Sequence, residues 1–452
     1  MFQKVLIANR GEIAVRIIQA CRDLGVIAVA VYSEADREAL HAQIADEAVC
    51  IGPARAADSY LNMNNIISAA LASGCQAIHP GFGFLSENPD FAEQTTQAGL
   101  AFIGPTAATI RLMGDKSEAK RNAIAAGVPV ALGTDGPLRD FDEAISEAER
   151  IGYPVMLKAA SGGGGKGIRV ARSVKDLKEA YDSAAAEAVA NFGDGRLYME
   201  KYIENPRHIE VQILGDHYGN VVHLYERECS VQRRHQKLIE ESPSAFVTPE
   251  LRERMTQAAV SLAKRVGYRN AGTIEFLVDS DRNFYFCEMN TRIQVEHPIT
   301  ELVTGIDLVK TQLRIAAGEP LSIRQENVKM TGHAIECRIN AENPALDFRP
   351  CPGRIESLHM PGGPGVRIDS AMYQGCEIPP YYDSMISKLI VYAPTRAEAL
   401  MKMKWALAEF LVEGVDTNID FQLNLIKDAD VEAARYDIGF LTRRRDLFPQ
   451  KP

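Results

Sequence analysis

Hydrophobic and polar positions change their period several times along the first third of the chain. Short runs of adjacent apolar residues alternate with segments in which apolar residues recur every three or four positions, as on one face of a helix. The predicted elements are a strand at Lys4–Asn9, a helix at Glu12–Leu24 closed by Gly25, a strand at Val26–Tyr32, a helix at Asn62–Ser73, and short strands at Ala77–Ile78 and Leu100–Ile103. This alternation predicts a doubly wound parallel sheet, which binds ligands in the loops at its strand ends.

Strand-like patterns dominate the middle of the chain. The predicted elements there are strands at Pro154–Ala159, Ile168–Ala171, Leu197–Ile203, Ile209–Leu214 and Val221–Glu226, and a helix at Pro249–Val266. Proline and glycine become frequent after about Gly332, and a helical pattern follows at Arg396–Leu411. We therefore place a domain boundary near residue 330 and predict a protein of mixed α/β and α+β class.

Length and composition indicate an enzyme-sized globular protein. A chain of 452 residues is too long for one hydrophobic core, so two to four domains are expected. The net charge of −10 argues against nucleic acid or an anionic membrane as the main partner. The eight cysteines form no C-x-x-C pair, the first residues lack the apolar core of a signal peptide, and no apolar run reaches the roughly 20 residues of a membrane span. These features predict a cytoplasmic protein with reduced thiols.

Polar residues occupy every second position of the segment Glu288–Glu296. They are Glu288, Asn290, Arg292, Gln294 and Glu296. In an extended chain these side chains share one face. The spacing is therefore compatible with an ordinary surface strand or with one polar wall of an active site.

The segment before this wall favours a metal site. Two apolar runs flank a turn signal, and a tight hairpin centred between Asp281 and Arg282 would place Glu275 opposite Glu288. Two carboxylates facing each other destabilise a sheet, unless a cation lies between them. Carboxylate and amide oxygens are the ligands that Mg²⁺ prefers. Glu275, Glu288 and Asn290 are therefore predicted to bind a divalent metal.

A glycine-rich segment points to phosphate binding. Gly162, Gly164 and Gly167 fit G-x-G-x-x-G, but a strand rather than a helix follows, and Lys166 precedes glycine rather than the serine or threonine of a P-loop. A glycine hairpin still allows backbone N–H groups to approach phosphate oxygens. Lys158 ends the preceding strand, where a cation suits a phosphate. A second cluster of cations, within Glu228–Lys237, suits another anion or a solvated basic loop.

Several motifs together resemble those of biotin carboxylase, the ATP-grasp component of biotin-dependent carboxylases. They are Ile7–Ala14, His79–Gly81 with Gly83–Asn88, the glycine segment, Ser230–Lys237 and Glu288–His297, in the order and spacing of the family from about residue 2 to about residue 445. The resemblance implies a preATP-grasp domain at 1–114, an ATP-grasp domain at 115–330 with a Gly-rich lid at about 130–203, and a biotin carboxylase C-terminal domain at 331–447.

The resemblance also implies a role for each matching position. Nucleotide and phosphate contacts fall on Lys116, Lys158, Gly164, Gly165, Glu200, Lys201, Ile203, His208, Gln232 and His235. The implied metal ligands are Glu275, Glu288 and Asn290, and the implied bicarbonate pocket is Lys237, Arg292, Gln294 and the Val295 backbone. Glu296 would be the general base, and Arg338 would stabilise a biotin enolate. Phe82 stands where the family usually has tyrosine, so a biotin contact there lacks the hydroxyl.

The implied activity is ATP- and bicarbonate-dependent carboxylation of biotin carried on a separate protein, with Mg²⁺ or Mn²⁺. Expected partners are a biotin carboxyl carrier protein and carboxyltransferase subunits, in a homodimer serving acetyl-CoA carboxylase and fatty acid synthesis. The alternatives are the same component of a pyruvate, other 2-oxo acid or acyl-CoA carboxylase, a carboxylate–amine ligase, or a silent nucleotide-binding subunit. The Arg292-x-Gln294-x-Glu296 wall together with Arg338 disfavours the carboxylate–amine ligase. The presence of Glu296, Lys237 and both metal carboxylates disfavours the silent subunit.

One further motif invites a wrong assignment. Met401-Lys402-Met403 matches the sequence around a biotinylated lysine, but it lies in the helical pattern of Arg396–Leu411. The biotin-bearing module presents its lysine on a β turn. We therefore predict that Met401 and Met403 pack into a core.

Overall fold

The computed structural model describes residues 1–159, 168–192 and 195–449, which form two compact units. The first unit comprises Met1–Val128, Arg207–Phe276 and Cys287–Pro452, and the second comprises Pro129–Pro206 and Leu277–Phe286. The predicted glycine loop, with Gly164 and Gly165, lies outside the described residues. Among the helices that are described, none has the length and apolar character needed to cross a membrane.

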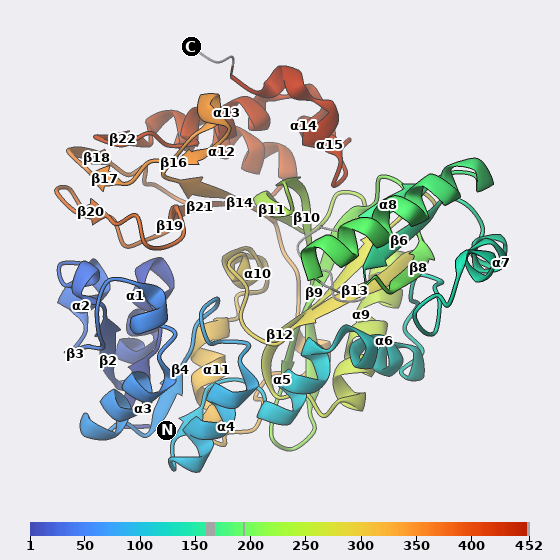
Figure 1. The fold of residues 1–452 in the computed structure, drawn as a ribbon. Coiled ribbons are helices and arrows are strands. Elements are labelled where there is room, and N and C mark those ends of the chain that lie inside the picture. The colour runs from blue at the N-terminus through green and yellow to red at the C-terminus, as the bar shows by residue number, and fades with distance from the viewer. Residues whose placement is uncertain (160–167, 193–194, 450–452) are drawn as a thin grey trace. The chain divides into compact units, whose positions relative to one another are not determined.

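A five-stranded parallel sheet forms the N-terminal part of the first unit (Figure 1). Its strands, in spatial order, are β3 (Glu47–Cys50), β2 (Ile27–Tyr32), β1 (Lys4–Ile7), β4 (Ala77–His79) and β5 (Ala101–Phe102). The associated helices are α1 (Gly11–Asp23), α2 (Leu40–Ile44), α3 (Met63–Ala72), α4 (Pro89–Gln97), α5 (Ala107–Gly114) and α6 (Lys116–Ala125). The parallel pairing of β1 with both β2 and β4 confirms the predicted doubly wound sheet.

An eight-stranded sheet carries most of the remaining first unit. Its strands, in spatial order, are β13 (Phe284–Asn290), β12 (Asn270–Val278), β9 (Arg207–Gly215), β10 (Val221–Arg233), β11 (Gln236–Ser242), β14 (His333–Asn340), β21 (Met385–Ala393) and β19 (Val366–Ser370). The helices of this part are α9 (Pro249–Arg265), α10 (His297–Thr304), α11 (Leu308–Ala316), α12 (Arg396–Glu409), α13 (Ile419–Lys427), α14 (Ala429–Glu432) and α15 (Phe440–Arg443). Short strands complete it: β15 (Glu342–Asn343), β16 (Arg349–Pro350), β17 (Gly353–Arg354), β18 (Ser357–His359), β20 (Glu377–Ile378) and β22 (Leu411–Glu413).

The alternation of side chains along β14 gives this sheet two different faces. Ile335, Cys337 and Ile339 are buried in the hydrophobic core with residues of α12, which packs on β14 and β21. Side chains at the intervening positions of a strand point to the opposite face. Glu336 and Arg338 occupy such positions, and α10 contacts the sheet through β10, β11, β14 and β21. This second face therefore combines charged side chains with a covering helix.

The second unit is a small sheet with two helices. Its strands, in spatial order, are β7 (Ile168–Ala171), β6 (Val155–Ala159) and β8 (Leu197–Lys201), all antiparallel, and its helices are α7 (Phe141–Ile151) and α8 (Val174–Phe192). Its core contains Leu138, Ala144, Val155, Leu157 and Met199. The predicted lid range of about 130–203 falls within this unit, although the domain boundaries remain predictions.

Three local expectations were wrong. Strand β10 continues to Arg233, well past the predicted end at Glu226. Half of the cationic segment Glu228–Lys237 is therefore buried strand, which disfavours its alternative interpretation as a solvated basic loop. The turn after β12 is centred on Asp281, because the Asp279 N–H donates to the Asn283 carbonyl at 2.9 Å. The expected two-residue turn would have been centred half a residue later, between Asp281 and Arg282.

The third correction concerns α12, which forms where a helix was predicted. Met403 is fully buried, as expected, but Met401 is 62% exposed and does not pack into the core. Two positions apart on a helix is about 200°, so the two side chains point to opposite sides. The Met-Lys-Met sequence is therefore one helical segment with a buried and an exposed methionine.

Candidate active site

Lys237 is the centre of a cluster of buried charges in the first unit. It lies on β11, and its Nζ donates to Glu296 Oε1 at 2.5 Å, to Glu210 Oε2 at 2.6 Å and to Glu275 Oε1 at 3.2 Å. Burial alone would lower the pKa of this lysine, but the surrounding carboxylates raise it well above its usual value. Lys237 therefore remains a cation, and it joins the predicted base to a predicted metal ligand.

Glu296 is fully buried between two cations. Its Oε1 accepts from Lys237, and its Oε2 accepts from Arg338 Nη2 at 3.0 Å. Arg338 is itself fixed by Glu240, whose Oε1 accepts from the Arg338 Nε at 2.6 Å. Burial would raise the pKa of the Glu296 carboxyl, but Lys237, Arg338 and the nearby Arg227 lower it below its usual value. Glu296 is thus an ionised carboxylate held in one orientation.

The predicted metal ligands Glu275 and Asn290 are in direct contact. Asn290 Nδ2 donates to Glu275 Oε1 at 2.7 Å, and Gln294 Nε2 donates to the same oxygen at 3.0 Å. Desolvation and the charge of Glu275 raise the pKa of Glu288, while Lys116 opposes this effect. A raised carboxyl pKa beside a second carboxylate marks a position where a cation is favoured. The three side chains offer hard oxygen donors, so they fit Mg²⁺ or Mn²⁺.

Arg292 is held by a residue from the N-terminal part of the first unit. Its Nε donates to Glu87 Oε2 at 2.9 Å, and its Nη2 donates to Asn290 Oδ1 at 2.9 Å. The Thr291 N–H also donates to Glu87, at 3.0 Å. Glu87 lies in the motif Gly83–Asn88 that the sequence singled out, but its function as a partner of Arg292 was not predicted.

The remaining positions of the predicted bicarbonate and biotin pocket lie close by. The Val295 carbonyl accepts from the buried Lys388 Nζ at 2.9 Å. The same Nζ lies 6.0 Å from the centre of the Phe82 ring. The Phe82 carbonyl accepts from Asn9 Nδ2 at 2.7 Å, which anchors the loop after β4. Lys388 was not among the predicted residues.

Three residues predicted to contact nucleotide lie on β9, on β10 and in the β10–β11 turn. His208 Nε2 lies 3.0 Å from Glu275 Oε2, and Gln232 Nε2 lies 3.3 Å from His208 Nδ1. His235 lies at the hairpin turn with φ of 65° and follows Arg234 with φ of 50°. Both values are in the left-handed region, which is unfavourable for side chains of this size. The turn therefore presents His235 at an energetic cost.

Among the described residues, four predicted nucleotide contacts belong to the second unit. Lys158 on β6 forms an ion pair with Glu200 on the neighbouring strand β8. Lys201 Nζ donates to the carbonyls of Gly152, at 2.9 Å, and Tyr153, at 2.7 Å. Ile203 lies two residues after the end of β8. The structure thus brings Lys158 and Glu200 together within this unit.

The sequence analysis did not identify Arg227, which holds Glu210, a partner of Lys237. Arg227 is fully buried and donates to Glu210 at 2.6 Å, Gln212 at 2.8 Å, Thr300 at 2.9 Å and Thr273 at 3.0 Å. The local signal was a run of charged residues, Glu226–Glu228, in an apolar strand. Such a run also fits an exposed strand end, so burial could not be inferred from it.

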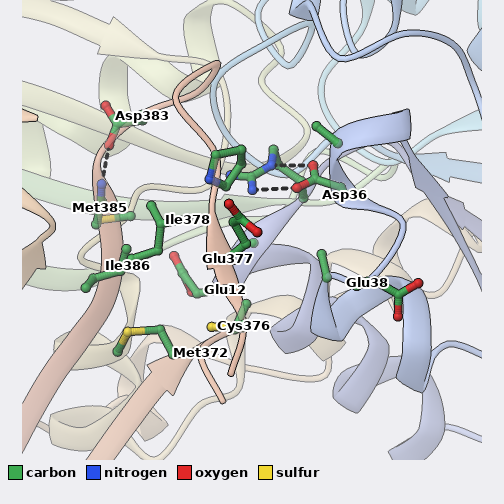
Figure 2. Close-up of a pocket in the computed structure, with 16 residues that line it drawn as sticks. Glu12, Asp36, Glu38, Met372, Cys376, Glu377, Ile378, Asp383, Met385 and Ile386 are labelled. Carbon is green, nitrogen blue, oxygen red and sulfur yellow. Dashed lines mark hydrogen bonds and ion pairs between the residues drawn. The ribbon is translucent and has the colours of Figure 1, made fainter. Parts of the chain in front are cut away.

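A separate cavity of about 90 Å³ lies beside the N-terminus of α1 (Figure 2). The figure shows Asp36 on one side and Glu12 near the middle, with Ile378 and Ile386 beyond it. Asp36 forms an ion pair with Arg10, which also lines the cavity. Of the predicted site residues that the structure describes, none lines this cavity. The predicted chemistry lies instead in the cluster around Lys237 and Glu296.

Comparison with known proteins identifies the family. The domain descriptions "Biotin carboxylase, N-terminal domain", "Carbamoyl-phosphate synthase L chain, ATP binding domain" and "Biotin carboxylase C-terminal domain" match residues 1–110, 115–324 and 336–443. Biotin carboxylase 1 of Bacillus subtilis (strain 168) is 55% identical over 442 residues, 98% of each chain. One pyruvate carboxylase subunit, from Methanothermobacter thermautotrophicus, is 55% identical over 428 residues, 95% of this chain and 87% of that protein.

A crystal structure extends the similarity to the fold. It is the biotin carboxylase domain dimer of 2-oxoglutarate carboxylase from Hydrogenobacter thermophilus, in complex with MgADP, ADP and bicarbonate. The two chains are 51% identical, each is covered completely, and the TM-score is 0.92.

The fold and these matches define an ATP-dependent ligase built around an ATP-grasp domain. The chain belongs to the biotin carboxylase family and is the biotin carboxylase component of a biotin-dependent carboxylase. The resemblance deduced from the sequence motifs is thereby confirmed.

Proposed function

We propose that this chain uses MgATP and bicarbonate to carboxylate biotin on a separate carrier protein, through carboxyphosphate. The observation that carries the proposal is Glu296, a buried carboxylate held between Lys237 and Arg338. This arrangement supplies a base between two cations, as deprotonation of bicarbonate beside a phosphoryl acceptor requires.

The bicarbonate pocket would be formed by Arg292, Gln294 and the backbone of Val295, with Lys237 beside it. Glu87 and Asn290 support this assignment, because they hold the Arg292 guanidinium in one orientation. A guanidinium that is fixed in advance loses less entropy when it binds a planar anion.

Proton transfer from bicarbonate to Glu296 would start the reaction. The pKa of Glu296 is lowered by its cationic neighbours, so its efficiency must come from position rather than from basicity. An oxygen of the resulting carbonate attacks the γ-phosphorus of ATP, and the bond to the β–γ bridging oxygen breaks, releasing ADP. Mg²⁺ held by Glu275, Glu288 and Asn290 would supply neutralisation of the phosphate charge.

Carboxyphosphate then divides into CO₂ and phosphate. The phosphate takes the proton from biotin N1′, and the nitrogen forms a new bond to the CO₂ carbon. Arg338 would stabilise the negative charge that develops on the ureido oxygen, since its guanidinium already lies against Glu296. The Phe82 ring offers apolar contact to biotin, without the hydroxyl that tyrosine would add.

The nucleotide contacts are assigned position by position from the match to the family motifs. We assign phosphate contacts to Lys116, Lys158, His208, Gln232 and His235, and adenine contacts to the segment Glu200–Ile203. Gly164 and Gly165 complete the assignment from sequence alone.

For the parent complex we propose an acetyl-CoA carboxylase that serves fatty acid synthesis, with the chain acting as a homodimer in the cytoplasm. A biotin carboxyl carrier protein and carboxyltransferase subunits would be its partners. A relative named as part of a pyruvate carboxylase is as similar as one named biotin carboxylase, so a pyruvate or other 2-oxo acid carboxylase is the second candidate. The chemistry of this chain is the same in each case.

The proposal is tested by measuring ADP release from the purified protein with MgATP, adding bicarbonate and free biotin separately and together. Turnover that requires both additions is expected. Turnover that needs neither, or that needs an amine instead, would assign the chain to another ATP-grasp reaction.

A further inference from the structure

A buried lysine outside the assigned machinery contacts the backbone of the predicted bicarbonate pocket. Lys388 lies on β21 and is completely buried. Its Nζ donates to the Val295 carbonyl at 2.9 Å and lies 3.1 Å from Glu12 Oε1 and 3.6 Å from Asp369 Oδ2. A buried lysine is costly unless it is paired, and these three oxygens supply partners for its charge.

The sheet register places this lysine directly beside the predicted biotin-stabilising arginine. Lys388 pairs with Arg338 across β14 and β21, and with Asp369 across β21 and β19. Two cations facing each other across a ladder repel. The charge of Arg338 is balanced by Glu240 and Glu296. The charge of Lys388 is balanced by Glu12 and Asp369. The two cations therefore form ion pairs with different carboxylates, although the charge of the buried Glu336 acts on both. Of the two cations, it is Arg338 that contacts Glu296.

The segment that Lys388 contacts is short and leads into a helix. Val295 is followed by Glu296 at the N-cap of α10, and the preceding Gln294 carbonyl lies 2.8 Å from His297 Nδ1. A peptide unit is planar, so fixing the Val295 carbonyl also fixes the N–H and the Cα of Glu296. The hydrogen bond from Lys388 therefore restrains the peptide unit that leads into Glu296.

We propose that Lys388 is a positioning residue for the bicarbonate-dependent step, acting through the Val295–Glu296 peptide. The inference rests on the proposed function of Glu296. If it is correct, loss of the lysine side chain lets this peptide rotate, which displaces both the base and the Val295 backbone from bicarbonate. The nucleotide contacts lie on other segments and should keep their affinity.

Lys388→Met tests this, because methionine keeps an unbranched apolar stem and removes the donor. Lys402→Met is the matched control: Lys402 also donates to two backbone carbonyls, those of Pro364 at 2.7 Å and Tyr392 at 2.8 Å, and these lie outside the site segments. For Lys388→Met we expect kcat/KM for bicarbonate to fall about 10- to 100-fold, the range for loss of residues that orient catalytic groups. The Kd for MgATP should stay within about 2-fold, and Lys402→Met should match wild type in both.

Removing a buried cation leaves Glu12 without its counterion, so Lys388→Met could reduce folding. The double variant Lys388→Met with Glu12→Gln removes both charges and restores neutrality. We expect it to fold and to remain defective toward bicarbonate, with faster hydrogen exchange at residues 295–297. Wild-type bicarbonate kinetics in either variant, or an equal loss of MgATP affinity, would overturn the proposal. A wild-type enzyme without bicarbonate-dependent turnover would instead overturn the proposed function.

Discussion

The pKa of Glu296 is lowered although the side chain is completely buried, because Lys237, Arg338 and Arg227 outweigh the cost of burial. A weak base can still be effective when it is already aligned with the proton it removes. The residue should therefore matter far more for turnover than for the binding of nucleotide.

Glu296→Gln tests this separation with almost no change in volume. We expect bicarbonate-dependent ADP release to fall by about 10²- to 10⁴-fold, the usual contribution of a general base. The Kd for MgATP, measured by calorimetry, should change by less than about 3-fold. Glu319→Gln, an exposed carboxylate, is the control. A loss of MgATP affinity as large as the loss of turnover would contradict the assigned role.

A second buried carboxylate is held by three polar side chains. Glu241 on β11 accepts from His333 Nε2 at 2.7 Å, from Arg396 Nε at 2.7 Å and from the Tyr436 hydroxyl. Burial would raise its pKa, but His333 and Arg396 lower it from 4.5 to about 2. The folded protein therefore binds the proton more weakly than the unfolded chain does.

A carboxyl group whose pKa is lowered by folding stabilises the folded protein at pH values above its pKa in the unfolded chain. For Glu241 this stabilisation disappears as the pH falls from about 4.5 to about 2. The full contribution corresponds to about 3 kcal/mol. We expect the free energy of unfolding of Glu241→Gln, from urea titrations between pH 6 and pH 3, to fall less steeply with acidification than that of wild type. Parallel pH profiles for the two proteins would contradict this linkage.

At the scale of secondary-structure elements, one arginine joins several pieces of the fold. Arg227 on β10 donates to side chains on β9, β12 and α10. All of these groups are fully buried, and water cannot replace the arginine if it is removed. The same guanidinium holds Glu210, which in turn contacts Lys237.

Arg227→Met should therefore be among the most destabilising single changes. Breaking a buried ion pair by removing one partner costs about 3–5 kcal/mol. Denaturant unfolding monitored by circular dichroism measures this directly. Arg121→Met removes an exposed ion pair with Glu118 on the same helix, and it should change stability by less than about 0.5 kcal/mol. Similar midpoints for both variants would mean that the Arg227 contacts contribute no net stability.

The sequence pattern predicted the elements better than their ends. The spacing of apolar residues in the N-terminal region predicted the parallel sheet, because segments with helical spacing alternate there with strand-like runs. The end of β10 was missed because Glu228 and Ser230 are polar yet buried, and they bond to each other within the strand. The turn at Asp281 was misjudged because Arg282 adopts φ of 63°, which a local pattern does not predict for arginine.

The same limit applies to the candidate site. Glu275 and Asn290 could be grouped in advance because a hairpin brings their strands together. The predicted period of two does not continue to Gln294, since β13 ends at Asn290 and residues 291–296 form bends and a turn. Arg227 and Lys388 could not be grouped in advance, since their partners are distant in sequence: Lys388 contacts Val295 and Glu12. Long-range polar contacts of this kind depend on packing rather than on local pattern.

At the scale of the whole chain, Tyr382 ties the C-terminal part of the first unit to its N-terminal sheet. The hydroxyl donates to the Ala54 carbonyl at 2.6 Å and bonds to Ser33 Oγ. The ring lies 4.2 Å from the Arg10 guanidinium and packs edge-on against Tyr60, with centroids 5.4 Å apart. Segments more than 300 residues apart in sequence are thus joined through one side chain.

Tyr382→Phe separates the hydrogen bonds from the packing. Phenylalanine keeps the ring against Arg10 and Tyr60, but it leaves the Ala54 carbonyl without its donor. We expect a loss of about 1–2 kcal/mol in the free energy of unfolding. Tyr381→Phe, at the neighbouring and 51% exposed ring, should change stability by less than about 0.5 kcal/mol. Because ADP release should persist in both variants at a temperature where they remain folded, a large loss of turnover in Tyr382→Phe alone would show that this tie acts on the active site as well as on stability.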